Sequence, residues 1–505
     1  MAEYSSLAAI DLGSNSFHCQ VGRVVGDQIY PLDSLREPVR LGAGLDADKL
    51  LDESSQERAL ACLERFGERL RGLDRHAVRA VGTNTLRVAK NAKSFLKRAN
   101  AALGFSIEVI AGKEEARLIF LGVQHGLPHS NERRLVVDIG GGSTELIVGA
   151  GYKPQKLASL YMGCVSYSMR FFPGGRITKS AMKQAELAAR AELQPIVAGY
   201  SPRQWQRAVG SSGTVRALAD ILQAHAYAEE AVTPAGLERL RAALIRAGSV
   251  EAAVSGIRPD RAPVLPGGLA ILLAVMSELG IEALTPAAGA MREGLLYDLL
   301  GRVHHHDLRD VTVAQFMQRY HVDVPQTQRV GTLAQALYRM LTLDADDADD
   351  RDPTYLGWAA SLHEIGISVA YSGYHKHSAY VLENADMPGF SRDEQMQVAL
   401  LVLAHRRSLK KVSERIEGAV DMRAVLALRL AALFHRGRSD IALPALQAKY
   451  QGGRFKLGVE AEWLARNPLT VTALHEEIRE WDKIGFELRI PGLDALEAPP
   501  ESAAA

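Results

Sequence analysis

Two segments of the chain carry an apolar residue at every second position. Phe17, Cys19 and Val21 form the first segment, and Leu146 and Val148 belong to the second. Each segment follows an apolar run and a short loop that contains glycine. Because a period of two is typical of a half-buried strand, the pattern predicts two β-hairpins with similar turns.

A different period dominates the segment after Ser54. Leu60, Leu63 and Leu70 recur there at intervals of a helical turn, which predicts an amphipathic helix. Ser54 and Glu57 have the spacing of a capping box, so we expect the helix to start at this pair.

The order of these patterns divides the chain into four predicted domains. Strand-like and helical segments alternate through residues 1–127 and again through 128–305, which predicts two duplicated α/β domains that face each other across a cleft. Residues 306–440 have only helical spacing and predict an all-helical domain. Residues 441–505 predict a small domain that contains strands and ends in a disordered tail.

Composition and charge narrow the function. Lys plus Arg and Asp plus Glu both number 59, so no overall positive field indicates a nucleic-acid partner. Cys19, Cys62 and Cys164 are too few and too scattered for a disulfide framework. The N-terminus has no secretory signal pattern, and the apolar run at 269–276 is shorter than the roughly 20 residues of a membrane span. We expect a cytoplasmic protein, with association at a membrane surface left open.

The turns of the two predicted hairpins have the composition of phosphate-binding loops. Glycine lets backbone N–H groups approach an anion, and Ser, Thr and Asn add further donors. An aspartate at the end of the preceding strand can hold a hydrated cation. The candidate phosphate-binding residues in these turns are Asp11, Ser14, Asn15, Ser16, Gly140, Gly141, Gly142 and Ser143.

Two further loops, which follow apolar runs and lead into helices, are candidates for the same cleft. Either loop alone is more often an ordinary turn, but their occurrence together with the two hairpins favours a phosphate site. Their candidate residues are Thr83, Asn84, Thr85, Arg87, Gly210, Ser211, Ser212, Gly213 and Thr214.

Acidic residues beside these loops are candidates for catalysis. Glu115 begins a predicted helix, where a carboxylate also fits the helix dipole without any function. Water that attacks a terminal phosphate needs a carboxylate to deprotonate it, and Glu115 could act as this base. Asp138 and Glu145 could bind Mg²⁺ or another divalent cation, although a turn cap and a solvated strand residue are their simpler interpretations. Arg87 could assist in neutralising the site.

Seven motifs of the chain resemble the exopolyphosphatase/guanosine pentaphosphate phosphohydrolase (Ppx/GppA) family in its long bacterial form. They are AAIDLGSNSFH (8–18), GTNTLR (82–87), GKEEARLIFLG (112–122), VVDIGGGSTEL (136–146), MGCVS (162–166), GSSGT (210–214) and GAMREGLLY (289–297). The resemblance implies duplicated actin-like (ribonuclease H-like) domains and a homodimer. It also implies that Glu115 is the catalytic base, that Asp138 and Glu145 bind the metal, and that the four loops bind phosphate.

The helical part resembles HD-type phosphohydrolases around His363 and Glu364. Glu364 replaces the aspartate of the HD pair, so this resemblance implies the fold without its metal chemistry. A set of residues nearby could guide a phosphate chain or could be an ordinary charged surface, and the sequence leaves both interpretations open. These residues are His375, His377, His405, Arg406 and Lys410.

The resulting hypothesis is an exopolyphosphatase that removes terminal orthophosphate from inorganic polyphosphate with Mg²⁺. The segment 172–175 and the surroundings of His375 and His405 favour this branch of the family. Hydrolysis of guanosine pentaphosphate (pppGpp) with the same residues is the alternative. An ATP-using kinase or chaperone of the same superfamily and a non-catalytic sensor of either compound are further alternatives.

Overall fold

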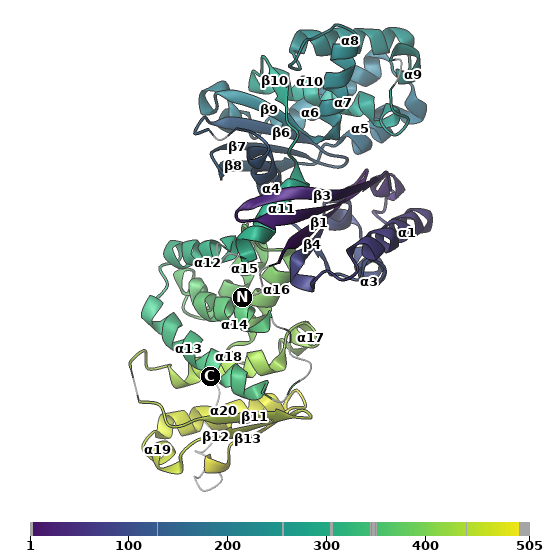
Figure 1. The fold of residues 1–505 in the computed structure, drawn as a ribbon. Helices are drawn as coiled ribbons and strands as arrows, with labels where there is room; N and C mark the ends of the chain where they lie inside the picture. Colours follow the sequence, from purple (N-terminus) through teal and green to yellow (C-terminus); the bar gives the residue numbers. More distant parts are fainter. Residues whose placement is uncertain are drawn as a thin grey trace. The chain divides into compact units, whose positions relative to one another are not determined.

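The computed structural model describes residues 4–128, 130–254, 257–303, 307–343, 345, 349, 351–440 and 442–493. The chain forms two compact units, Met1–Leu308 (unit 1) and Arg309–Ala505 (unit 2), which are drawn in Figure 1. The predicted disordered tail lies outside the described residues. The division into four domains stays a prediction.

Unit 1 contains two five-stranded sheets with the same topology. The first has the order β3-β2-β1-β4-β5 and the second has the order β8-β7-β6-β9-β10. In each sheet the first three strands along the chain are antiparallel neighbours, and the last two continue the sheet in parallel from the first strand. The strands are β1 (Ser6–Leu12), β2 (Phe17–Val25), β3 (Gln28–Glu37), β4 (Val78–Gly82), β5 (Ile107–Val109), β6 (Arg134–Ile139), β7 (Thr144–Ala150), β8 (Lys153–Leu160), β9 (Arg207–Ser211) and β10 (Leu284–Pro286).

Helices cover the faces of these sheets, so the central strands are buried on both sides. Every residue of β6 is buried, which explains its unbroken apolar run. The helices of unit 1 are α1 (Glu53–Leu70), α2 (Asn84–Val88), α3 (Ala92–Leu103), α4 (Gly112–His125), α5 (Cys164–Phe171), α6 (Lys179–Leu193), α7 (Ser212–Ala224), α8 (Pro234–Ala247), α9 (Val250–Ala253), α10 (Leu265–Leu279) and α11 (Met291–Val303). The predicted mixed α/β class of this part is confirmed.

The predicted capping box at the start of α1 is wrong. Asp52 is the N-cap residue, and its carboxylate accepts hydrogen bonds from the backbone N–H of Ser55 at 2.6 Å and from the hydroxyl of Ser54 at 3.1 Å. Aspartate is among the best N-cap residues, and its side chain reaches the N–H group three residues ahead. Ser54 therefore lies inside the first turn.

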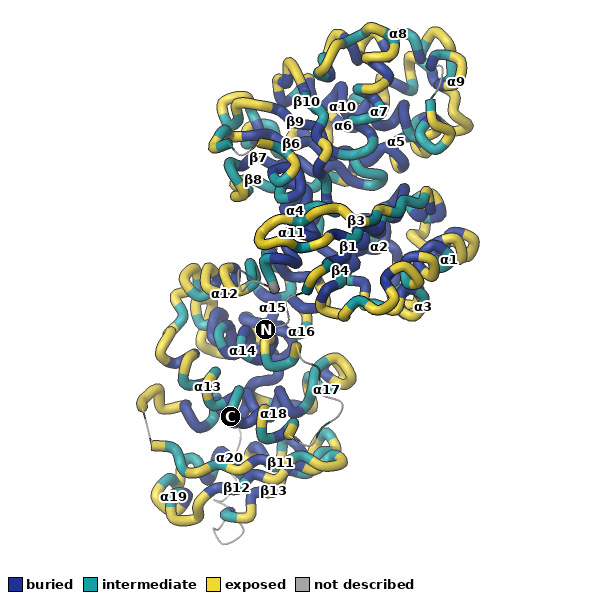
Figure 2. Tube along the Cα trace, viewed as in Figure 1, coloured by how far each residue is buried: buried dark blue, intermediate teal, exposed yellow. Residues whose placement is uncertain are grey.

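One helix of the described residues is apolar and long enough to resemble a membrane span. The window Ala262–Leu279 includes α10, and 78% of it is buried inside the protein. Figure 2 shows α10 as buried along most of its length. A buried helix of this kind is typical of a protein core, and here it packs against α5 and α6.

Two glycine-bearing helices, α4 and α11, pack with their backbones in contact. A Cβ atom added at Gly122 would lie 1.9 Å from the carbonyl oxygen of Ala290, and one added at Gly294 would lie 1.8 Å from that of Leu118. Only glycine fits this crossing, which holds the start of α11 against the segment 118–122 of α4. The first turn of α4 precedes that segment. The first turns of α4 and α11 carry Glu115 and Arg292, respectively.

Unit 2 is built from helices and one three-stranded sheet on a common apolar core. Its helices are α12 (Leu308–Arg319), α13 (Val324–Leu341), α14 (Asp352–Leu362), α15 (Tyr374–Asn384), α16 (Arg392–Ala404), α17 (Ser413–Ile416), α18 (Met422–Phe434), α19 (Ala461–Ala465) and α20 (Pro468–Asp482). The sheet contains β11 (Gln447–Gln451), β12 (Arg454–Gly458) and β13 (Glu487–Arg489). The helical character of the C-terminal part is confirmed, whereas its HD-like classification stays a prediction.

Candidate active site

The turns of the β1–β2 and β6–β7 hairpins lie directly against each other. A Cβ atom added at Gly141 would lie 2.9 Å from the Cβ of Ser14 and 3.2 Å from the backbone nitrogen of Asn15. One added at Gly142 would lie 2.5 Å from the side-chain oxygen of Asn84. The close approach of the two turns therefore depends on the missing side chains at positions 141 and 142.

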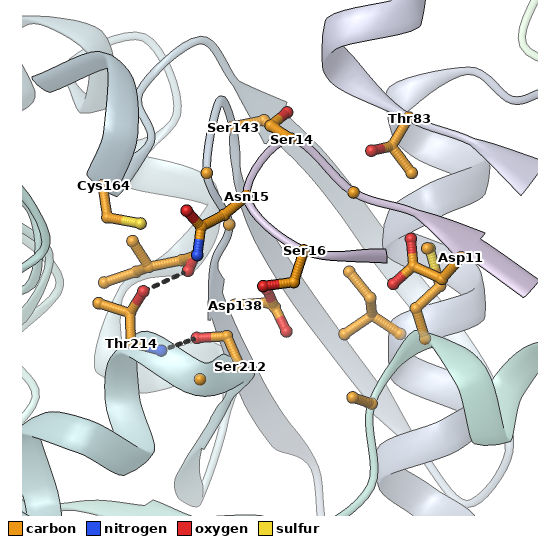
Figure 3. Close-up of a pocket in the computed structure, with 18 of the residues that line it drawn as sticks. Asp11, Ser14, Asn15, Ser16, Thr83, Asp138, Ser143, Cys164, Ser212 and Thr214 are labelled. Carbon is orange, nitrogen blue, oxygen red and sulfur yellow. Dashed lines mark hydrogen bonds between the residues drawn. The ribbon is translucent and has the colours of Figure 1, made fainter. Parts of the chain in front are cut away.

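A cleft opens beside this contact, and most of the predicted residues line it. Figure 3 shows Asp11, Ser16 and Asp138 with their side chains directed into it. The predicted residues in its lining are Asp11, Ser14, Asn15, Ser16, Thr83, Glu115, Asp138, Gly140, Gly141, Gly142, Ser143, Ser212, Gly213 and Thr214. Those outside the lining are Asn84, Thr85, Arg87, Glu145, Gly210 and Ser211.

Two of the residues outside the lining bind to residues that line it. The hydroxyl of Thr85 donates to the hydroxyl of Ser14 at 2.7 Å. The guanidinium of Arg87 donates to a carboxylate oxygen of Glu115 at 2.6 Å, and the same nitrogen donates to the carbonyl oxygen of Ile110 at 3.0 Å. Arg87 thus orients Glu115 and is not itself exposed to the cleft.

Buried carboxylates gather at one side of the site. Asp138 of β6 and Glu145 of β7 are directly opposed in the hairpin register. Burial raises the pKa of Asp138 to about 6, and burial together with the nearby charges of Glu115 and Asp138 raises the pKa of Glu145. Burial also raises the pKa of Asp11 to about 8, with Glu115 contributing. Closely packed carboxylates resist ionisation in this way unless a cation joins them.

Hydrogen bonds hold this acidic group only in part. Ser159 donates its hydroxyl to Glu145 at 2.8 Å. The Oδ1 atom of Asp11 is buried without a hydrogen-bond partner. An unpartnered buried carboxylate oxygen is costly, which is expected where a ligand or ion completes the site.

Three arginines of the cleft lining were missed by the sequence analysis. Arg216, Arg261 and Arg292 line the cleft together with His18. Arg292 lies in the GAMREGLLY motif and Arg216 follows the GSSGT loop, so inspection of the motifs and their neighbours could have identified both. Arg261 lies in no motif, and only the fold brings it to the cleft.

The prediction that a set of residues in unit 2 could guide a phosphate chain is corrected in part. His375 and His405 are buried, with ring centroids 6.3 Å apart. Burial lowers the pKa of both, that of His375 to about 4, so these imidazoles are neutral and present no positive charge. The guanidinium of Arg406 lies 4.5 Å from the ring centroid of Tyr374. The remaining predicted residues are the half-buried His377 and the exposed Lys410.

Comparison with known families matches nearly the whole chain. The profile of the Ppx/GppA phosphatase family matches residues 20–303, and the profile of Ppx/GppA phosphatase, domain III, matches residues 308–478. The chain belongs to the Ppx/GppA phosphatase family. It is therefore a hydrolase of this family, with an actin-like α/β unit followed by a helical part.

Individual relatives of the Ppx/GppA family were also found. A protein of Vibrio cholerae named guanosine-5'-triphosphate,3'-diphosphate pyrophosphatase is 39% identical over 489 residues, which cover 96% of this chain and 97% of the relative. A protein of Vibrio atlanticus with the same name is 38% identical over 486 residues, with the same coverage of both chains. A crystal structure described as an exopolyphosphatase from Cytophaga hutchinsonii is 26% identical, with a TM-score of 0.53, and covers 59% of this chain and 98% of its own.

These relatives overturn the exopolyphosphatase hypothesis. The proteins that match this chain almost end to end at 38–39% identity are named for guanosine-5'-triphosphate,3'-diphosphate. The structure named as an exopolyphosphatase matches a shorter part of the chain at lower identity. The loops and Glu115 were predicted to act on a terminal phosphoryl group, which polyphosphate and pppGpp both have, so they could not distinguish the two substrates.

Proposed function

We propose that this protein hydrolyses pppGpp at its 5′ end, releasing orthophosphate and guanosine tetraphosphate. The near full-length similarity to proteins named for this substrate supports the choice of substrate. The observation that carries the chemistry is the position of Glu115, which is 8% exposed and lines the cleft beside both glycine-rich turns. A base in this position can reach water next to a bound phosphate chain.

The loops and arginines of the cleft would bind the phosphate chain. The turns offer backbone N–H groups and the hydroxyls of Ser14, Ser16 and Ser143. Positive charge comes from Arg216, Arg261 and Arg292, which also line the cleft. Donors fixed before the substrate arrives stabilise the negative charge that develops on the phosphoryl oxygens.

Glu115 would then act as the general base. It accepts one proton from water, the water oxygen bonds to the terminal phosphorus, and the bond from that phosphorus to the bridging oxygen breaks. The leaving group is the β-phosphate of guanosine tetraphosphate. Arg87 holds the carboxylate of Glu115 by the 2.6 Å ion pair and so sets its direction.

We propose Mg²⁺ as the cofactor, with Asp138 and Glu145 as its protein ligands. Two opposed buried carboxylates with raised pKa form a donor set that fits a divalent cation. Among the described residues, no group of three or more His, Cys, Asp or Glu could hold a metal ion alone. Substrate and water oxygens would complete the shell, as is usual for Mg²⁺. The ion supplies positive charge next to the phosphoryl group that is transferred.

The experiment compares wild type, Glu115→Gln and the exposed-site control Glu57→Gln on pppGpp, GTP and polyphosphate. We expect Glu115→Gln to lower kcat on pppGpp by about 10²–10⁴-fold because the base is lost. Its affinity for pppGpp, measured by calorimetry, and its thermal unfolding should stay close to wild type, as should all properties of Glu57→Gln. Retained turnover in Glu115→Gln would refute the assigned base. Equal kcat/KM for polyphosphate and pppGpp in wild type would refute the substrate.

A further inference from the structure

The two hairpins place different residues opposite their strand-end aspartates. In the first hairpin Asp11 of β1 is paired with His18 of β2. In the second hairpin Asp138 of β6 is paired with Glu145 of β7. The duplicated position therefore carries an imidazole in the first hairpin and a carboxylate in the second.

His18 is in hydrogen-bond contact with an arginine of the cleft. Its Nδ1 atom lies 2.6 Å from a guanidinium nitrogen of Arg292. Because arginine is always protonated and has no acceptor, Nδ1 must accept this bond. His18 is consequently the neutral tautomer with its proton on Nε2.

The surroundings of His18 keep it neutral. Burial comes first among the causes that lower its pKa to about 3, followed by the positive charge of Arg292 and then of Arg36, Arg261 and Arg216. The Nε atom of Arg292 is buried without a partner. The same guanidinium lies 3.8 Å from a carboxylate oxygen of Glu293, so the 2.6 Å contact with His18 is the shorter of these two restraints on its direction. The contact with His18 itself removes none of the positive charge.

We propose that His18 is a positioning residue for substrate phosphate, which holds Arg292 toward the cleft without placing a further negative charge against it. This inference rests on the proposed function, because it takes the cleft to be the phosphate site. A carboxylate at position 18, like the one at 145, would pair with Arg292 and cancel its charge. A neutral acceptor orients the arginine and leaves its charge to the phosphate chain.

Three variants of one side chain separate orientation from charge. His18→Gln keeps a neutral acceptor, His18→Leu removes the acceptor, and His18→Glu adds a negative charge. We expect His18→Leu to raise KM for pppGpp by about 10-fold with kcat within about 3-fold, since one charge-assisted hydrogen bond is no longer aimed. His18→Gln should stay within about 3-fold of wild type, and His18→Glu should raise KM by about 100-fold because charge is lost as well.

Binding of inorganic tripolyphosphate, measured by calorimetry without Mg²⁺, provides a readout that does not need turnover. The dissociation constants should be lowest for wild type and His18→Gln, higher for His18→Leu and highest for His18→Glu. If wild type fails to hydrolyse pppGpp but this order is found, the proposed function is wrong and the role of His18 stands. Equal binding by all four proteins would overturn the role.

A double variant tests that His18 acts through Arg292. We expect Arg292→Gln to weaken tripolyphosphate binding by at least as much as His18→Leu, and His18→Leu/Arg292→Gln to bind no more weakly than Arg292→Gln alone. Thermal unfolding is measured for each variant to identify any that does not fold. If His18→Leu does not fold, Arg292→Gln is compared with wild type in its place. Additive losses in the double variant would show that His18 contacts phosphate independently, which contradicts a positioning role.

Discussion

The two hairpins of unit 1 have the same topology and opposite electrostatics. The first pairs Asp11 with a neutral His18 that binds Arg292, whereas the second pairs Asp138 with Glu145. Duplication of the backbone thus gives two turns that can both approach phosphate. The side chain opposite each strand-end aspartate distinguishes the two turns, with a neutral imidazole in the first hairpin and a carboxylate in the second.

The difference extends to the charges behind each hairpin. In the first half, Asp298 of α11 accepts hydrogen bonds from Arg79 at 2.5 Å, from Arg302 at 3.0 Å and from Arg117, all in the interior. These arginines lower the pKa of Asp298 well below its usual range. In the second half, the carboxylates of Asp138 and Glu145 face each other without a paired guanidinium in direct contact, and their pKa values are raised. Removing a carboxylate should therefore have opposite effects on stability in the two halves.

The largest expected effect is that of Asp298→Ala. Removing the carboxylate takes away the anion that Arg79, Arg117 and Arg302 share, although Arg117 stays paired with Glu114 and Arg79 with Glu108. Breaking a buried ion pair in this way costs about 3–5 kcal/mol of unfolding free energy. Urea denaturation measures the loss. The matched control is Glu278→Ala, whose partner Arg190 is 45% exposed at the side chain. The control should lower the unfolding free energy by about 0–1 kcal/mol. An equal loss of unfolding free energy in both variants would contradict the role of Asp298 as the shared partner of the buried arginines.

Glu145→Gln should act in the reverse direction on stability and strongly on turnover. Removing one of two opposed carboxylates relieves repulsion, which is about 4 kcal/mol at 4 Å and an effective dielectric constant of 20, so the unfolding free energy should rise. Removing a proposed Mg²⁺ ligand should lower kcat by about 10²–10³-fold. Denaturation without Mg²⁺ and a Mg²⁺ titration of kcat measure the two effects. A Glu145→Gln variant that is less stable than wild type and fully active would contradict the expected difference between Glu145 and Asp298.

Next in size is Gly141→Ala, which tests the contact between the two turns. The added Cβ would meet Ser14 at 2.9 Å and would force the first turn away from the second. Because a shift of about 1 Å can cost up to 10²-fold in rate, we expect kcat/KM to fall by about 10–10²-fold. Gly199→Ala is the control, since its nearest neighbour is the flexible end of Lys156 at 4.0 Å. Equal activity of both variants would mean that the turns bind substrate separately.

The sequence predicted the backbone of the site better than its charges. Alternation at Phe17 and Val21 located the first hairpin, and the glycines of both turns predicted a cleft that the fold places around Glu115. Arg261 could not be found, because it reaches the cleft only through the folding of a segment with no motif. His375 was misjudged because a lone histidine does not reveal whether packing will bury and neutralise it. Mg²⁺, a homodimer and a cytoplasmic location stay predictions.

The substrate was misjudged for a different physical reason. Glycine-rich turns and a base recognise a terminal phosphoryl group, and this group is the same in polyphosphate and pppGpp. The residues used to choose between the two, such as Gly174 and His375, do not line the described cleft. Selection between the two substrates must depend on what contacts the rest of the molecule, which no short motif of this chain encodes.

The smallest expected effect belongs to Asp52→Ala, which lies outside the cleft lining. Loss of this N-cap removes the 2.6 Å hydrogen bond to the backbone of Ser55 and should cost about 1 kcal/mol of unfolding free energy. Turnover of pppGpp should not change, because α1 lies outside the cleft lining. Ser54→Ala is the matched control, and it should cost less because the exposed Ser54 hydroxyl bonds to the side chains of Asp52 and Arg58 and not to the backbone of the helix start. If Ser54→Ala lowered the unfolding free energy in urea more than Asp52→Ala, Ser54 would be the N-cap residue of α1. The assignment of the cap to Asp52 would then be wrong.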